Sequence, residues 1–424
     1  MTAIVGLQRG RIAFWALAIS LAIAALASGA DAADFKVLHR FKGGKDGESP
    51  LAGLVADDIG DLYGTTAGAG GSGPGKHCAK SCGNGYEFLH GGGHHVIFTL
   101  NGKDGSNPTA PLLYYAGNFY GTTAYGGKND GGVVFEFEPD GTYRVLYNFC
   151  AQPNCTDGYV PSGGLIADGA GNLYGTTFIG GAHNGGAIFE LSASGVESVL
   201  YSFCSRPNCT DGTGPLAGLI ADAAGNFYGT TERGGTGCNG SGCGTAFELT
   251  PGGVETVLYS FCSRKTCEDG SVPMAPLVAD GAGNFYGTTT SGGRYGEYFY
   301  DDGVVFKLAP DGTESVLYSF CRRQSYCADG ANPEAGLTFD SAGNLYGTTL
   351  DGGTMSCGCG TVFRLTPGGK ETVLHAFDFA DGTSLQVGVL LLQEGDLLGT
   401  APEGGQECDN LGYGCGTVFE VKTK

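Results

Sequence analysis

One Asp-Gly pair recurs along the chain and is the most regular set of groups that could bind an ion. Its aspartates are Asp46, Asp104, Asp157, Asp211, Asp269, Asp329 and Asp381. Carboxylates at equivalent places in a ring could hold a hard cation such as calcium, which is the cofactor that the sequence suggests. The alternative, which we favour, is that each aspartate caps its own turn beside a glycine needed for its backbone freedom.

A second set of polar groups breaks this regularity. The segment 290–303, TSGGRYGEYFYDDG, is longer and richer in tyrosine and charge than its counterparts, and a neighbouring TERGG loop adds two charged residues. Tyrosine rings stack on sugar faces and carboxylates accept hydrogen bonds from hydroxyl groups, so these loops suit a glycan or a peptide. A solvated loop without a ligand stays open as the alternative. The predicted ligand-binding residues are Glu232, Arg233, Arg294, Tyr295, Glu297, Tyr298, Tyr300, Asp301 and Asp302.

Other residues that could do chemistry indicate less. His90, His94 and His95 flank a GGG turn and could hold a metal, but we interpret this turn as exposed and as lying opposite the long loops. No serine-nucleophile elbow, phosphate loop or metalloprotease signature occurs in a supporting context, so we predict no catalytic residue.

The sixteen cysteines occur as close pairs, each pair within one loop. Such spacing predicts local disulfides in an oxidising compartment. Zinc is the competing interpretation, but the spacing is irregular and most of these loops lack histidine. The pair separated by a single glycine is the least certain, because its ring is strained. The predicted bridges are Cys78–Cys82, Cys150–Cys155, Cys204–Cys209, Cys238–Cys243, Cys262–Cys267, Cys321–Cys327, Cys357–Cys359 and Cys408–Cys415.

These groups are positioned by a repeat. GNLYGTT at 171–177 has close copies whose tyrosines are Tyr63, Tyr120, Tyr174, Tyr228, Tyr286 and Tyr346, with Leu398 in the seventh place. Replacement of the tyrosine by leucine, while Gly399 and Thr400 remain, favours packing over chemistry. Each unit of about 56 residues contains four β-type runs separated by turn signals, which predicts a four-stranded antiparallel meander.

Seven such units predict a seven-bladed β-propeller over residues 33–424. The first run of each unit is expected to line the central channel, where small residues such as Ala217 and Gly218 suit the crowding. The fourth run of each unit is expected to lie outermost. FKVLHRF at 35–41 reads as a fourth strand and GTVFEV at 416–421 as a third, so the N-terminal strand should complete the last blade. An open solenoid is the alternative, and it would leave both end strands unpaired.

The repeat motif resembles that of the GloVer (choice-of-anchor) tandem-repeat family of exported bacterial proteins. The pattern DG…P-x-A-G-L…D…G-N-L-Y-G-T-T…G-G…G-T-V-F-E-L…V-L-Y-S-F carries the resemblance over essentially all of residues 33–424. It implies an extracellular repeat protein and transfers no catalytic residue. Many members carry a C-terminal surface anchor, whereas this chain ends at Lys424 without a sorting signal, which puts anchoring in doubt.

The N-terminal residues 1–32 read as a signal peptide. Arg9 and Arg11 precede an apolar run, and Ala30 and Ala32 frame a cleavage site, although a retained anchor is the alternative. We therefore predict a secreted protein, periplasmic or extracellular, without a membrane span after cleavage. The formal charge of −20 argues against nucleic acid as a partner.

The expected function is a rigid binding or scaffold module for a glycan, a peptide or an envelope component, present as a monomer and acting through the face of the long loops. The alternative is a propeller enzyme of lyase or lactonase type with its site at the channel mouth. An enzyme needs perturbed titratable groups clustered in one pocket, whereas a binder needs an exposed aromatic and polar patch.

Overall fold

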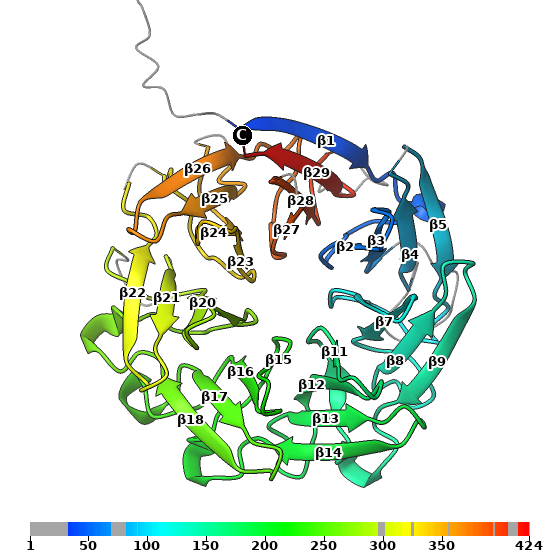
Figure 1. Ribbon diagram of the computed structural model, residues 1–424, viewed down its shortest axis with the longest axis horizontal. Coiled ribbons are helices and arrows are strands. Elements are labelled where there is room, and N and C mark those ends of the chain that lie inside the picture. Colours follow the sequence, from blue (N-terminus) through cyan, green and yellow to red (C-terminus); the bar gives the residue numbers. More distant parts are fainter. Residues whose placement is uncertain are drawn as a thin grey trace, which may run out of the picture. The chain divides into compact units, whose positions relative to one another are not determined.

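The computed structural model describes residues 33–68, 82–90, 92–295, 302–323, 326–354, 357–392, 395–405 and 414–423. Residues Ala33–Lys424 form one compact unit, in which the sheets stand as seven blades around a central axis (Figure 1). The predicted seven-bladed β-propeller is therefore confirmed. The predicted signal peptide lies outside the described residues. Over the described ranges, no helix is long and apolar enough to cross a membrane.

Each blade is an antiparallel meander whose strands we call A to D from the axis outward. The A strands are β2 (Val55–Ala56), β6 (Leu113–Tyr115), β11 (Ile166–Ala167), β15 (Ile220–Ala221), β19 (Val278–Ala279), β23 (Thr338–Phe339) and β27 (Leu390–Leu391). The B strands are β3 (Leu62–Thr66), β7 (Asn118–Thr123), β12 (Leu173–Ile179), β16 (Phe227–Thr231), β20 (Phe285–Thr289), β24 (Leu345–Thr349) and β28 (Asp396–Ala401).

The outer half of each blade contains the longer C–D ladder. The C strands are β4 (Asn84–Phe88), β8 (Val133–Phe137), β13 (Ala187–Leu191), β17 (Thr245–Leu249), β21 (Val304–Leu308), β25 (Thr361–Leu365) and β29 (Thr417–Lys422). The D strands are β5 (His94–Thr99), β9 (Tyr143–Asn148), β14 (Glu197–Ser202), β18 (Glu255–Ser260), β22 (Glu314–Ser319), β26 (Glu371–Ala376) and β1 (Asp34–Arg40). An additional strand, β10 (Tyr159–Pro161), pairs with β12.

Short 3₁₀ turns lie in the long loops of the described chain. They are η1 (Gly44–Asp46), η2 (Pro153–Cys155), η3 (Pro207–Cys209), η4 (Cys238–Gly240) and η5 (Lys265–Cys267). Four of them contain or adjoin one of the local disulfides, so the bridges stiffen loops and not blades.

The innermost strands are shorter than the sequence pattern suggests. Of the run 215–222, PLAGLIAD, only Ile220–Ala221 forms a strand. A Cβ at Gly218 would lie 2.9 Å from the Gly164 carbonyl oxygen of the previous blade, so the backbones converge closely at the axis. Pro215 has no N–H to give to a ladder. The crowded centre thus leaves most of this run as irregular backbone, which lines the channel as predicted.

The YGTT motif packs blades together, as the sequence predicts. A Cβ at Gly175 would lie 2.8 Å from the Phe189 ring, so glycine makes room for that ring. The Tyr174 ring packs on Phe227 of the next blade at a centroid distance of 4.8 Å. The Thr176 hydroxyl donates a hydrogen bond of 2.9 Å to the Ala217 carbonyl, also in the next blade. Equivalent threonine bonds are Thr65–Pro108, Thr230–Ala275, Thr288–Ala335, Thr348–Val387 and Thr400–Ala52.

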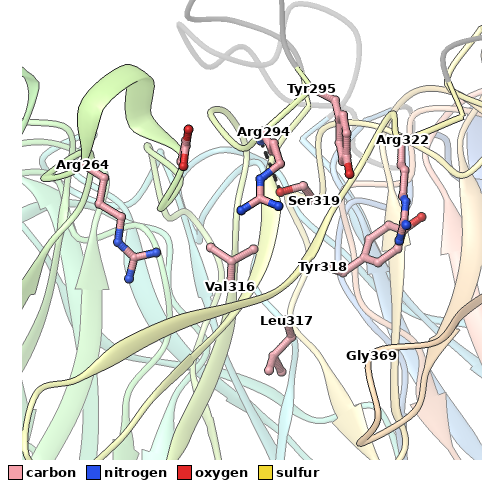
Figure 2. Close-up of a pocket in the computed structure, with 10 residues that line it drawn as sticks. Arg264, Arg294, Tyr295, Val316, Leu317, Tyr318, Ser319, Arg322 and Gly369 are labelled. Carbon is pink, nitrogen blue, oxygen red and sulfur yellow. Dashed lines mark hydrogen bonds between the residues drawn. The ribbon is translucent and has the colours of Figure 1, made fainter.

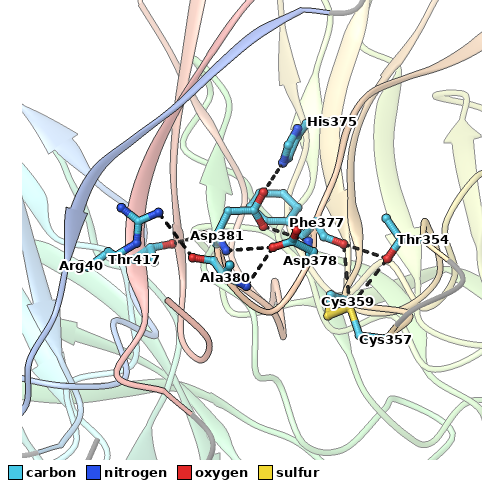
Figure 3. A network of polar contacts seen from close by, with 10 residues as sticks. All are labelled: Arg40, Thr354, Cys357, Cys359, His375, Phe377, Asp378, Ala380, Asp381 and Thr417. Carbon is cyan, nitrogen blue, oxygen red and sulfur yellow. Dashed lines mark hydrogen bonds and ion pairs between the residues drawn. A yellow bond between two sulfur atoms is a disulfide. The ribbon is translucent and has the colours of Figure 1, made fainter. Parts of the chain in front are cut away.

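The ring is closed by the two ends of the chain. Strand β1 pairs with β29 from Asp34–Lys422 to Arg40–Thr417, so the N-terminal strand completes the seventh blade as predicted. The loop after blade 6 reinforces this joint (Figure 3). Arg40 donates a hydrogen bond to the Ala380 carbonyl at 3.4 Å, and the Thr417 hydroxyl donates one to the Asp381 carbonyl at 2.7 Å.

Six of the predicted disulfides have both partners in the described residues, and all six are formed as predicted. They are Cys150–Cys155, Cys204–Cys209, Cys238–Cys243, Cys262–Cys267, Cys321–Cys327 and Cys357–Cys359. Cys82 and Cys415 are also disulfide-bonded. Their predicted partners, Cys78 and Cys408, lie outside the described residues.

Candidate functional site

The loop of blade 5 that the sequence singles out borders a pocket on the outer side of that blade (Figure 2). The pocket has a volume of about 180 Å³. Its walls come from the loops after β18 and β20, strand β22, the loop after β22, and the turn between β25 and β26. The lining residues are Arg264, Glu268, Arg294, Tyr295, Val316, Leu317, Tyr318, Ser319, Arg322 and Gly369.

The backbone that supports this pocket has the same hydrogen bonding as the equivalent backbone in other blades. In several blades, the residue after the Gly-Gly pair donates its backbone N–H to a side chain at the end of strand D. These bonds are Lys128–Asn148, Ala182–Ser202, Thr236–Ser260 and Arg294–Ser319, at 2.8, 3.1, 3.2 and 3.2 Å. Four blades therefore hold a side chain at the same supported place. Of these four, only blade 5 has an arginine there, followed by a tyrosine.

Three arginines gather at this pocket although the chain carries a formal charge of −20. Arg264 lies 2.6 Å from the Glu314 carboxylate and also donates a hydrogen bond to the Glu314 carbonyl. Arg294 and Arg322 are exposed, and neither forms an ion pair within the described chain. Figure 2 shows the Arg294 side chain between those of Arg264 and Tyr295. The pocket is therefore a local positive site that suits an anion.

The structure brings together only some of the predicted ligand-binding residues. Arg294 and Tyr295 line the pocket. Glu232 and Arg233 occupy the corresponding loop of blade 4, pair with each other at 2.9 Å and do not line it. Asp302 is buried two residues before β21 begins. The remaining four, Glu297, Tyr298, Tyr300 and Asp301, lie outside the described residues.

The aspartates of the Asp-Gly pairs organise their own loops. Asp211 is fully buried and accepts hydrogen bonds from the Tyr201 hydroxyl at 2.9 Å and from the backbone N–H groups of Ser205 and Arg206 at 2.8 and 3.2 Å. Asp157, Asp269 and Asp329 make the same kinds of contact, and Asp46, Asp104 and Asp381 also accept backbone N–H groups of their own loops. This is the role that we favoured from the sequence, and a calcium ring stays a prediction.

A residue of the next blade completes each cluster, and we call the resulting set a seam triad. Its members are a strand-D side chain, the loop aspartate, and the first or second residue of strand D in the next blade. Four seams have the Tyr–Asp–Glu form, namely Tyr147–Asp157–Glu197, Tyr201–Asp211–Glu255, Tyr259–Asp269–Glu314 and Tyr318–Asp329–Glu371. A β-bulge at the same place in the C–D ladder re-aims the strand-D side chain.

Burial makes the seam glutamates weaker acids than an exposed glutamate. Burial, together with the charge of the seam aspartate, raises the pKa of Glu197, Glu255, Glu314 and Glu371 to about 7. In the next three seams an arginine opposes this rise by pairing with the glutamate. The pairs are Arg206–Glu255, Arg264–Glu314 and Arg323–Glu371, at 2.7, 2.6 and 3.2 Å. Gln152 stands at the arginine position beside Glu197, which therefore lacks this compensation.

The strand register gives the other three seams different residues. Between blades 1 and 2 the triad is Phe98–Asp104–Tyr143, between blades 6 and 7 His375–Asp381–Phe35, and between blades 7 and 1 His39–Asp46–His94. His375 lies 2.8 Å from Asp381 (Figure 3), and the Phe35 ring stacks on it at 3.6 Å.

The last of these seams corrects our interpretation of the histidines near the GGG turn. His90 and His95 are exposed as expected. The His94 side chain is only 15% exposed and faces Asp46, because His94 opens strand β5 at the position where four other blades have a glutamate. Burial lowers the pKa of His94 to about 4 and also lowers the pKa of His39.

Three important residues were missed from the sequence: Arg264, Arg322 and His39. Arg264 and Arg322 lie in cysteine loops, which we interpreted only as disulfide sites. His39 replaces the tyrosine of VLYSF in the segment VLHRF, residues 37–41. Alignment of the repeats against one another would have marked Arg322 and His39 as departures from the pattern, whereas Arg264 shares its position with Arg206 and Arg323.

The central channel offers a second cavity, of about 400 Å³. Its walls are mostly glycine, alanine, proline and aliphatic side chains of the A segments, and Glu334 is the one titratable side chain among its described lining residues. Burial raises the pKa of Glu334, and Asp351 raises it further. One carboxyl group in an apolar channel does not by itself provide a pair of acid and base.

Several solved structures are similar to the chain at low identity. A luciferin-regenerating enzyme is 12% identical, with a TM-score of 0.42, and the match covers 92% of this chain and 95% of that one. A gluconolactonase from Xanthomonas campestris is 14% identical, with a TM-score of 0.39 and coverage of 72% and 82%. A putative oxidoreductase (glucose dehydrogenase) from Thermus thermophilus is 15% identical, with a TM-score of 0.41 and coverage of 92% and 99%.

No curated protein matches the chain. The Gloeobacter/Verrucomicrobia repeat model, in contrast, matches residues 76–299 and 241–424. The two overlapping matches span most of the propeller, and their repeat is the one that the sequence motif resembles. The chain therefore belongs to the Gloeobacter/Verrucomicrobia repeat family.

Proposed function

We propose that the chain is an exported binding module whose blade 5 pocket holds an acidic sugar residue of a glycan. The observation that carries this proposal is the gathering of Arg264, Arg294 and Arg322 at one pocket of a strongly acidic chain. Local disulfides fit an oxidising compartment. Binding, and not catalysis, is what an exposed patch of charge and aromatic rings supports.

The recognition chemistry follows from the lining side chains. The guanidinium groups of Arg294 and Arg322, which form no ion pair with another described residue, suit a carboxylate, to which arginine can donate two parallel hydrogen bonds. The Tyr295 ring offers a face for a sugar, and Glu268 can accept hydrogen bonds from sugar hydroxyl groups. The volume of about 180 Å³ is below that of sites for drug-sized ligands, so one sugar unit is the expected occupant.

The loops that carry the three arginines are fixed in place before a ligand binds. Arg264 lies within the loop closed by Cys262–Cys267, and Arg322 lies within the loop closed by Cys321–Cys327. The backbone N–H of Arg294 donates a hydrogen bond to the Ser319 hydroxyl group on strand β22. A ligand therefore has fewer loop conformations to freeze, which lowers the entropic cost of binding.

The test is an equilibrium titration of the protein with an oligogalacturonide and with a neutral malto-oligosaccharide of equal length. We expect the acidic sugar to bind more tightly, and Arg294→Ala and Arg322→Ala each to weaken its binding about ten- to hundredfold. Lys128→Ala is the matched control, because Lys128 has the same backbone support in blade 2. No binding of the acidic sugar, or equal loss in the Lys128 variant, would contradict the proposal.

The propeller-enzyme alternative has no comparable support. It would need a converging set of titratable groups at the channel mouth, and the described channel lining supplies Glu334 alone. Its distinct consequence is turnover, so an unchanged oligosaccharide recovered after prolonged incubation with the protein separates binding from hydrolysis or elimination.

A further inference from the structure

We propose that His39, Asp46 and His94 form a binding site for a divalent transition metal, with zinc as the preferred ion, at the seam where the ring closes. This site lies between blades 7 and 1 and does not depend on the proposed glycan-binding function. Two imidazole groups and one carboxylate are a donor set that zinc uses in proteins, and this set can leave a coordination position open to solvent.

The three side chains already converge. Asp46 Oδ2 lies 3.2 Å from His39 Nε2, and Asp46 Oδ1 lies 3.3 Å from His94 Nδ1. One possible ligand atom from each residue lies within 4.8 Å of the other two. The two imidazole rings are stacked, with their planes 24° apart and their centroids 4.2 Å apart. Small shifts of side chains that are already neighbours would let one ion contact all three.

Two further contacts distinguish the cluster from a chance meeting on the surface. The backbone N–H of Lys42 donates to Asp46 Oδ2 at 2.9 Å, which orients the carboxylate as an outer partner of a metal ligand does. His94 Nε2 is buried and has no hydrogen-bond partner within the described residues, so hydrogen bonding alone does not account for a histidine there. The three side chains are 17%, 23% and 15% exposed, which leaves a path for an ion.

The other seams show that this arrangement is an exception to the repeat. Four of them have tyrosine and glutamate in place of the two histidines. The seam between blades 6 and 7 has His375 beside its aspartate, but Phe35 stacks on that ring and offers no ligand atom. The imidazole pair thus occurs where strand β1, which carries His39, meets strand β5, which begins with His94.

The position of this site would give a bound metal ion a structural role in closing the ring. His39 and Asp46 belong to the N-terminal segment that completes blade 7, whereas His94 belongs to blade 1. An ion bound by all three would link the closing strand to the neighbouring blade. Because the site exists only in the closed ring, the metal would stabilise the folded protein by mass action.

The experiment is a zinc titration of metal-free, untagged protein by calorimetry, with melting curves recorded with and without zinc. The double variant His39→Tyr/His94→Glu gives this seam the form of four others, so it is expected to fold. His94→Phe copies the seam between blades 6 and 7. His95→Ala, at an exposed neighbour, is the matched control.

We expect one zinc ion per chain and a higher melting temperature with zinc in the native protein and in the His95 variant. Both seam variants should bind zinc at least tenfold more weakly, and zinc should not raise their melting temperature. NMR of the native protein tests the site without substitution, because zinc should shift the ring signals of His39 and His94 and leave those of His183 and His375 in place. Absence of zinc binding, equal binding by the seam variants, or shifts confined to other histidines would overturn the proposal.

Discussion

At the scale of single residues, the seams contain carboxylates that are buried and unequally compensated. Glu255, Glu314 and Glu371 each pair with an arginine, whereas in the Glu197 seam Gln152 occupies the position of that arginine. Burial nevertheless raises the pKa of all four glutamates to about 7. Such a carboxyl group binds its proton more tightly in the folded state than in the unfolded state. It therefore stabilises the fold only at pH values at which it stays protonated.

We predict that Glu197→Gln stabilises the protein at pH 8 and has little effect at pH 4. The folded-state pKa lies above the unfolded value, so the contribution of Glu197 is fully present below about pH 4.5 and is lost as pH rises through 7. Allowing for solvent screening at this half-buried position, the gain at pH 8 is about 1–2 kcal/mol. Chemical unfolding at both pH values measures it.

Glu255→Gln is the matched comparison for this prediction. The pKa of Glu255 is also raised to about 7, so this variant should show a gain of the same sign at pH 8, reduced because the ion pair with Arg206 is lost. An equal effect of Glu197→Gln at pH 4 and pH 8 would show that the acidity of Glu197 is not the cause.

At the scale of elements, the strands were predictable and their cross-blade contacts were not. The YGTT and VLYSF runs carry strand propensity and turn signals within a few residues, so the meander follows from local pattern. The A strands are shorter than their pattern, because Pro215 and the close backbones at Gly218 and Gly164 leave little room for a ladder. The seam triads join residues about 50 positions apart through a bulged register, which local pattern does not specify.

At the same scale, we predict that mild reduction loosens the loops and leaves the blades intact. Each bridge closes only a few residues, which corresponds to roughly 2 kcal/mol of chain entropy before strain is subtracted. The blades are held by buried clusters such as Phe203, Leu219 and Phe247 between blades 3 and 4. Hydrogen exchange should therefore accelerate in 150–155, 204–209, 238–243 and 262–267 while far-ultraviolet circular dichroism stays unchanged. Collapse of the β signal at room temperature would contradict this.

At the scale of the whole molecule, the ring and its closure were predictable because the two chain ends carry complementary parts of one blade. FKVLHRF and GTVFEV gave the missing fourth strand and the unpaired third strand, and the structure pairs them as β1 and β29. The pocket was predictable only in part: Arg294 and Tyr295 stood out in an unusual loop, but Arg264 and Arg322 reach the same place from loops that begin about 30 residues away on either side.

We predict that deletion of residues 34–41 lowers the melting temperature and promotes aggregation. The deletion uncovers the edge of β29, which pairs with β1 over the length of the strand, and an exposed strand edge is a template for association. Thermal unfolding and light scattering measure the two effects. An unchanged melting curve in a monomeric variant would count against closure by β1.

The central claim is that a constant propeller frame presents one charged pocket on blade 5. Hydrogen exchange of the protein with and without the oligogalacturonide tests it most directly, because it locates the ligand without any substitution. The account predicts slower exchange in 262–268, 292–295 and 316–323, the segments that line the pocket, and no change in the corresponding segments of blades 2 and 3. Protection of the channel-lining A segments, or of all blades equally, would contradict it.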